Sequence, residues 1–221
     1  MNALSELTKY MVRTQRSVDV CSNNIANMNS CGFKRQLDIQ RDRVDATYVD
    51  SSPGALSETT NQQDLALRGQ AYFTVRNGSN VFYTRDGHFK LNEKNQLVTE
   101  RGDYVLGKKG IITVNSREMT VDNNGNVFDG GTKVDSLLLA EPQADSRMVN
   151  VGNGMINFRA KPATGSNLVQ SGALEESNVN SLNEMVRMIE LIKNFDMGQR
   201  FVKMQDTLMG KISTEVGKST N

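Results

Sequence analysis

Apolar side chains in the first thirty or so residues recur at alternating steps of three and four. A repeat of this kind places them along one stripe of an α-helix and leaves the polar residues on the remaining faces. Because no Gly or Pro occurs before Gly32, we expect a helix over residues 1–32 that ends at a left-handed Gly32. The stripe comprises Leu4, Leu7, Met11, Thr14, Val18, Cys21, Ile25 and Met28, with Thr14 as its polar interruption.

The C-terminal segment, residues 173–221, shows the same repeat, and Ser177, Asn178 and Ser181 are candidate N-caps for its helix. A period close to 3.5 residues favours supercoiled pairing of helices, so we expect the two terminal helices to form a coiled-coil-like pair. The periodicity leaves open whether each stripe packs within one chain or between chains. The C-terminal stripe comprises Met188, Leu191, Phe195, Gly198, Val202, Gln205, Met209, Ile212 and Val216, weakened at Gly198 and Gln205.

Short apolar segments alternate with turn sequences from residue 64 to residue 172, as in "AYFTV" before "RNGSN" and "VFYT" before "RDG". Strands at this spacing predict an all-β domain of the sandwich or barrel type, with tight hairpins at Asn77-Gly78 and Asn124-Gly125. Residues 33–63 carry the Ser, Pro, Gly and Thr of a linker, and we expect an extended or partly helical arm there. The predicted fold class is α+β.

Composition narrows the function classes. The 221 residues carry a formal net charge of +1 without a charge block, which argues against a nucleic-acid partner. No apolar run approaches the roughly 18 residues that a membrane span needs, so membrane insertion is not expected. The N-terminus lacks the apolar stretch and cleavage site of a secretory signal peptide.

Candidate chemistry is sparse. His88 is the single histidine and Cys21 and Cys31 are the two cysteines, a set that has no metal-ligand spacing and for which we expect no disulfide. Cys21 falls on the apolar stripe and is expected in the core, and His88 is expected at a strand edge. Asp64 and Arg85 are expected to form a structural salt bridge rather than an acid–base pair. We therefore expect no catalytic residue, no cofactor, no metal and no small-molecule substrate.

Four ordered segments resemble the flagellar basal-body rod and hook proteins, and together they cover nearly all of the chain. "SNNIANMNSCGFKRQ" is similar to that family's N-terminal signature, and "NQQDLALRGQAYFTV" and "YTRDGHFKLNEKNQLVTERGDYVLG" are similar to two motifs of its β domain. "ESNVNSLNEMVRMIELIKNFDMGQRFVKMQDTLMGKI" is similar to its C-terminal helix. Asn95, Phe195 and Cys31 depart from the family pattern: Asn95 stands where Gly is frequent and Phe195 where Tyr is usual.

The resemblance implies a structural, non-enzymatic protein. It implies export by the flagellar type III apparatus without cleavage, and self-assembly with other rod proteins into a tube that spans the periplasm. The short segment from Phe33 to Asp64 favours the proximal type of rod protein over the distal type. A secreted β-domain binding module is the competing class, and it would need converging polar groups.

The expected assembly interface combines both stripes with the signature asparagines. For Asn23, Asn24 and Asn27 two interpretations stay open: a solvated polar face, or amides that hydrogen-bond to neighbouring subunits. The interface is expected to comprise Leu4, Leu7, Met11, Val18, Asn23, Asn24, Ile25, Asn27, Gly32, Phe33, Asn178, Met185, Met188, Ile189, Ile192, Phe195, Val202, Met209 and Ile212.

Overall fold

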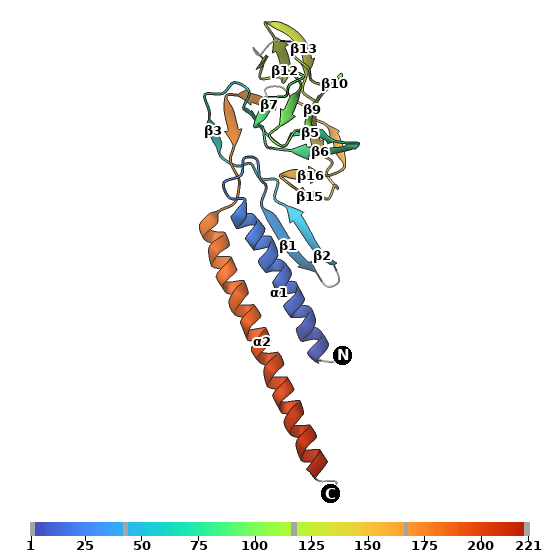
Figure 1. Ribbon diagram of the computed structural model, residues 1–221, viewed down its shortest axis with the longest axis vertical. Coiled ribbons are helices and arrows are strands. Elements are labelled where there is room, and N and C mark those ends of the chain that lie inside the picture. Colours follow the sequence, from blue (N-terminus) through green and yellow to red (C-terminus); the bar gives the residue numbers. More distant parts are fainter. Residues whose placement is uncertain (1–2, 42–43, 116–118, 166–167, 219–221) are drawn as a thin grey trace. The chain divides into compact units, whose positions relative to one another are not determined.

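The computed structural model describes residues 3–41, 44–115, 119–165 and 168–218 (Figure 1). The chain divides into two compact units, each described by itself. The first unit comprises Met1–Ile25, Asp38–Ala46 and Asn180–Asn221, and the second comprises Ala26–Leu37 and Thr47–Val179. Within the described residues, neither helix has a stretch that is long and apolar enough to cross a membrane.

Helices stand at the two ends of the chain, with strands between them, so the predicted α+β class is confirmed. The helices are α1 (Ala3–Ala26) and α2 (Ser181–Lys218). The strands are β1 (Gln36–Arg41), β2 (Val44–Val49), β3 (Leu56–Glu58), β4 (Leu65–Leu67), β5 (Tyr72–Asn77), β6 (Asn80–Thr84), β7 (Phe89–Leu91), β8 (Leu97–Thr99), β9 (Tyr104–Gly107), β10 (Gly110–Ile111), β11 (Met119–Val121), β12 (Asn126–Asp129), β13 (Thr132–Ser136), β14 (Leu139–Pro142), β15 (Val149–Gly152), β16 (Met155–Asn157), β17 (Ala160–Pro162), β18 (Val169–Ser171) and β19 (Ala173–Glu175).

The first unit contains the two helices, which lie side by side and antiparallel (Figure 1). The thiol of Cys21 donates to the carbonyl of Glu184 over 3.1 Å, and farther along the pair a Cβ on Gly198 would lie 3.1 Å from Cγ of Met11. Helix α1 ends at Ala26, so the prediction that it extends to Gly32 is wrong. The polar run after Ala26 folds instead into successive turns, in which Ser30 N–H donates to Asn27 and Phe33 N–H to Ser30.

The start of α2 also differs from the prediction. The side-chain oxygen of Asn180 accepts the backbone N–H of Asn183 over 3.0 Å, which is the N-cap bond of a helix whose first residue is Ser181. The N-cap is therefore Asn180 rather than Ser177, Asn178 or Ser181.

The second unit is built on a large antiparallel sheet with the order β15-β16-β6-β5-β9-β8-β7, where β10 lies beside β9 and β14 joins β5 to β17. Asn77 pairs with Asn80 across a two-residue turn, which confirms the Asn77-Gly78 hairpin. The Asn124-Gly125 turn joins β11 to β12, as predicted. Asn95 and Gly78 both adopt positive φ, of 55° and 58°, because tight turns need left-handed residues there.

Residues 33–63 contain strands rather than a helical stretch. β1 pairs with β2, and β3 pairs with β19, close to the start of α2. Inside the first unit, the hydroxyl of Ser17 on α1 donates to the carboxylate of Asp38 on β1 over 2.6 Å. The segment between the N-terminal signature and Asp64 is therefore held to other parts of the chain by strand pairing and by this hydrogen bond.

Two apolar clusters fill the second unit. The larger gathers Leu65, Phe73, Phe89 and Leu97, each at most 1% exposed, and the rings of Phe73 and Phe89 meet edge to face at 4.9 Å. In the smaller cluster, Phe158 stacks on Tyr83 at 4.2 Å. Burial of such side chains contributes about 1.5–3 kcal/mol each, so this core holds the β region without help from a disulfide.

Candidate functional site

The inner face of the helix pair is partly polar. The amide nitrogen of Asn24, which is fully buried, donates to the carboxylate of Glu184 over 3.3 Å, and Glu184 is 1% exposed. Asn24 is therefore neither a solvated residue nor, through this bond, a contact to another subunit. Cys21 lies on the same face with no exposed surface, which confirms its predicted place in the core.

Gly198 is a point of close approach between the two helices. It is buried on α2, and a Cβ added to it would lie 3.1 Å from Cγ of Met11, closer than ordinary van der Waals contact. The sequence identified Gly198 as a weak point of the stripe, whereas the structure shows that a small residue is what lets the helices approach here. Stripe residues Met188, Phe195 and Val202 are half-buried on this inner face.

The outer face of α2 exposes a second set of large apolar side chains. Met185, Ile189 and Ile192 are 45%, 54% and 46% exposed. Met209 belongs to the stripe that contains Gly198, yet it is 61% exposed. The predicted interface residues therefore separate into an inner set, covered within the chain, and an outer set. On α1, the side chains of Leu7, Met11, Val18 and Ile25 are half-buried, and Asn23 is exposed. The side chains of Leu4 and Ile212 lie outside the described residues. We call the following exposed side chains the outer face: Leu182, Met185, Val186, Ile189, Ile192 and Met197. Phe201, Met204 and Leu208 are also exposed, and they line an open groove together with Leu7 of α1.

Inside the second unit, the chain leaving α1 and the chain entering α2 are bonded to each other. Gly32 has φ of 65°, and its N–H donates to the carbonyl of Glu175 over 2.7 Å. Asn178 is half-buried: its side-chain oxygen accepts the N–H of Arg35, and its amide donates to Ser52. Phe33 is 3% exposed. These contacts lie within one chain. Gly32, Phe33 and Asn178, which the sequence predicts to belong to the assembly interface, are therefore packed or bonded inside the chain.

A buried ion cluster lies directly behind this junction. The carboxylate of Glu175 accepts from Nζ of Lys34 at 2.5 Å and from Nη1 of Arg85 at 3.0 Å, and all three side chains are at most 1% exposed. Arg85 also donates to the carbonyls of Leu67 and Gly69. Burial lowers the pKa of the Lys34 ammonium, an effect that its contact with Glu175 opposes.

The cluster corrects one prediction. Arg85 pairs with Glu175 rather than with Asp64, whose carboxylate accepts the side-chain amide of Asn61 over 3.0 Å. The guanidinium of Arg85 also lies 4.9 Å above the ring of Tyr72. Burial raises the pKa of the Tyr72 phenol to about 12. Arg85 thus fixes parts of the chain that are far apart in sequence.

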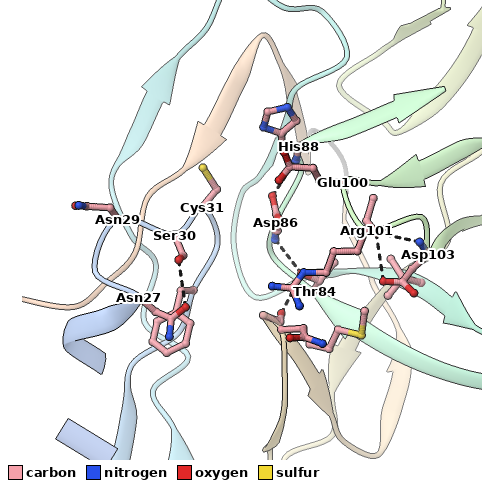
Figure 2. Close-up of a pocket in the computed structure, with 16 residues that line it drawn as sticks. Asn27, Asn29, Ser30, Cys31, Thr84, Asp86, His88, Glu100, Arg101 and Asp103 are labelled. Carbon is pink, nitrogen blue, oxygen red and sulfur yellow. Dashed lines mark hydrogen bonds between the residues drawn. The ribbon is translucent and has the colours of Figure 1, made fainter. Parts of the chain in front are cut away.

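A polar cavity of about 300 Å³ opens between the turns after α1 and the large sheet, inside the second unit (Figure 2). Cys31, Asp86 and His88 all line it, a set that in another protein could suggest a nucleophile and its base. Burial, and then the charges of Asp86 and Asp64, raise the pKa of the Cys31 thiol, which is opposite to the activation that a nucleophile needs. His88 is exposed beside the start of β7, as predicted. The described residues include no group of three potential metal ligands.

Three family models match the chain in order. "Flagella basal body rod protein" matches residues 11–34, "Flagellar hook protein FlgE/F/G D1 domain" matches residues 66–128, and "Flagellar basal body rod FlgEFG protein C-terminal" matches residues 170–215. They fall on α1 with its turns, on the β region, and on β18 to α2.

Flagellar rod proteins from other bacteria are similar in sequence to this chain over most of its length. The chain is 30% identical over 220 residues to the flagellar basal-body rod protein FlgF of Caulobacter vibrioides, covering 88% of this chain and 89% of the relative. It is 30% identical over 202 residues to FlgF of Mesorhizobium japonicum, covering 82% and 84%. It is 27% identical over 252 residues to FlgG of a Buchnera aphidicola strain, covering 90% and 94%. The chain thus belongs to the flagellar basal-body rod protein family, and within it to the FlgF/FlgG type.

Proposed function

We propose that this chain is a structural subunit of the bacterial flagellar basal-body rod and assembles with copies of itself and with other rod proteins through its terminal helices. The observation that carries the proposal is the outer face of α2, where large apolar side chains from Leu182 to Met197 are about half exposed or more. Large apolar side chains that gather in the open on one helix face mark a surface that another protein covers.

The internal contacts support the same function. A subunit that transmits torque must hold the segments that lead into its helices firmly. Hydrogen bonds at Gly32 and Asn178 and the buried ion pair of Glu175 join these two segments inside the second unit. Because the inner stripe is half-buried or buried within the chain from Met188 to Val202, the outer face is the apolar surface left for neighbouring subunits. A coiled-coil-like packing of helices between subunits follows from the 3.5-residue period of the stripes.

We further propose the proximal, FlgF-like type. The alignment with the Buchnera FlgG extends over 252 positions, more than the 221 residues of the chain, so this chain lacks residues that the relative has. The alignment with the Caulobacter FlgF extends over 220 positions and covers 88% of the chain, so the chain lacks fewer residues relative to this FlgF than to the FlgG. Location in the periplasm and export by the flagellar type III apparatus belong to the same proposal, as does the absence of enzymatic activity.

The test is a charge placed on the outer face. Ile189 is 54% exposed, so Ile189→Asp should leave the monomer folded while abolishing assembly and motility, because burying an unpaired carboxylate between subunits costs several kcal/mol. Gln199→Asp adds the same charge at an exposed polar position of the same helix and serves as the control. Motility equal to wild type in cells carrying Ile189→Asp would refute the outer face as an assembly surface.

A further inference from the structure

The cavity beside the turns after α1 is built from two sides of the second unit. Asn27, Asn29, Ser30 and Cys31 line one side, and residues of the sheet and its loops line the other (Figure 2). Its volume of about 300 Å³ lies at the lower end of the range of ligand-binding pockets. The space is therefore large enough to admit a side chain from another molecule.

The charge of the lining is negative. Three carboxylates, of Asp86, Glu100 and Asp103, face one guanidinium, that of Arg101, which gives a net charge of −2 with His88 neutral (three negative charges and one positive). Asp103 is well satisfied, since its carboxylate accepts the amide of Asn77 and the hydroxyl of Thr99. The uncompensated negative charge of the cavity therefore belongs to the other carboxylates of its lining.

Asp86 carries this uncompensated negative charge. Its carboxylate accepts one hydrogen bond, from the backbone N–H of His88 over 3.0 Å, and no cation of the described residues lies within ion-pair distance of it. Burial raises its pKa and the charge of Glu100 acts in the same direction, while the hydrogen bond from His88 and the charges of His88 and Arg101 oppose the rise. A partly desolvated carboxylate without an ion-pair partner is costly, and the entry of a further cation would offset that cost.

Helix α2 offers the complementary groups. Lys193, Arg200 and Lys203 are exposed, and none of them is in an ion pair with a described residue. Under the proposed function, helices of one copy pack against other copies. Such packing would offer the exposed cations of α2 to a cavity whose lining carries a net negative charge.

We propose that the cavity is a socket for a lysine or arginine side chain from α2 of a second copy of this chain. The inference rests on the proposed function for the source of the side chain, but the preference of the cavity for a cation can be measured on the monomer. The socket would set the relative position of two copies, because a charged side chain in a defined cavity fixes register more than it adds affinity.

The first experiment uses Cys31, which lines the cavity, as a native reporter in the full-length monomer. Iodoacetamide labelling of Cys31 is followed by peptide mass spectrometry while N-acetyl-arginine methylamide is added, and the uncharged N-acetyl-citrulline methylamide serves as the matched control. We expect saturable protection by the arginine probe, about tenfold at about ten times its Kd, and none by citrulline. Cys21, with no exposed surface, reports that the protein stays folded.

Asp86→Asn tests the charge without changing the shape of the cavity, and each variant is compared with itself without probe. The variant should lose the protection. Absence of protection in wild type, equal protection by citrulline, or unchanged protection in Asp86→Asn would each overturn the inference, whether or not the chain assembles.

The second experiment compares Cys31 labelling in assembled protein and in monomer. We expect slower labelling in the assembly, restored in one of the variants Lys193→Gln, Arg200→Gln or Lys203→Gln, and unaffected by Lys90→Gln, which removes an exposed cation of the second unit. Assembly with Cys31 as reactive as in the monomer, or with no restoring variant, would overturn the socket and leave the proposed function standing. Failure to assemble would count against the proposed function, while the monomer experiment still decides the socket.

Discussion

Replacing Gly32 by Ala should destabilise the second unit far more than its size suggests. Gly32 has φ of 65°, a conformation that costs an L-residue about 1–2 kcal/mol. A Cβ there would also lie 2.2 Å from the backbone nitrogen of Asp86 and 2.3 Å from the carbonyl carbon of Arg85, whereas real Cβ contacts stay beyond 3.0 Å. Both neighbours are backbone, so the turn or the strand end must move.

The size of the effect follows from what that movement breaks. A displacement of about 0.8 Å, the difference between 3.0 and 2.2 Å, would strain the 2.7 Å bond from Gly32 N–H to the carbonyl of Glu175. Loss of that buried bond adds about 1–3 kcal/mol. We therefore expect Gly32→Ala to lower the free energy of unfolding by about 3 kcal/mol or more, which corresponds to a fall in Tm of about 6–12 °C.

Gly78→Ala is the matched control. Gly78 has φ of 58°, but an added Cβ would meet nothing within 4 Å, so the control carries the conformational cost alone, about 1–2 kcal/mol. Urea unfolding of both variants, followed by circular dichroism in the β region, measures the difference between them. Equal destabilisation of the two variants would show that the close approach of Gly32 to Arg85 and Asp86 is not a constraint, and the argument would fail.

Three other predictions test separate features. Glu175→Gln leaves two buried cations without their counter-charge and should lower the free energy of unfolding by about 3–5 kcal/mol, measured by urea unfolding. Glu141→Gln, in a half-exposed pair, should lower it by less than about 1 kcal/mol. Similar losses of stability in the two variants would contradict the burial argument. Asn180→Ala removes the N-cap of α2 and should lower the stability of the helix by about 1 kcal/mol, seen as a loss of helicity at lower temperature. An unchanged melting curve would show that Asn180 is not the N-cap. Because burial and Asp86 raise the pKa of Cys31, its alkylation rate should rise at higher pH than that of a free thiol, and Asp86→Asn should shift the rate profile to lower pH; an unshifted profile would remove Asp86 as a cause.

Features set by a few neighbouring residues were predictable from sequence. The Asn77-Gly78 hairpin and the left-handed Asn95 follow from local steric rules, since few residues tolerate positive φ in a tight turn. The two terminal helices follow from periodicity over many residues. The end of α1 was missed because the asparagine run after Ala26 continues the apolar period through Met28, while its backbone forms turns.

Glu175 shows what local reasoning cannot reach. Its partners lie 141 and 90 residues away in the sequence, at Lys34 and Arg85, and no pattern near Glu175 distinguishes it from the adjacent exposed Glu176. Nothing in the sequence favoured Glu175 over Asp64 as the partner of Arg85. Burial decides between such candidates, and burial depends on how strands pair across the whole unit.

The sequence leaves the use of each face of α2 open for a related reason. Helix α2 carries apolar side chains on more than one side, so Met188 and Phe195 fit one stripe while Ile189 and Ile192 fit another, and the sequence gives no ground for ranking them. The position of α1 decides which stripe is inward, because Met11 of α1 lies against Gly198 and the stripe that contains Gly198 therefore faces α1. A helix that packs both against its own chain and against neighbouring subunits needs two apolar faces. The pattern that blurs the prediction of packing is therefore the pattern that an assembling subunit requires.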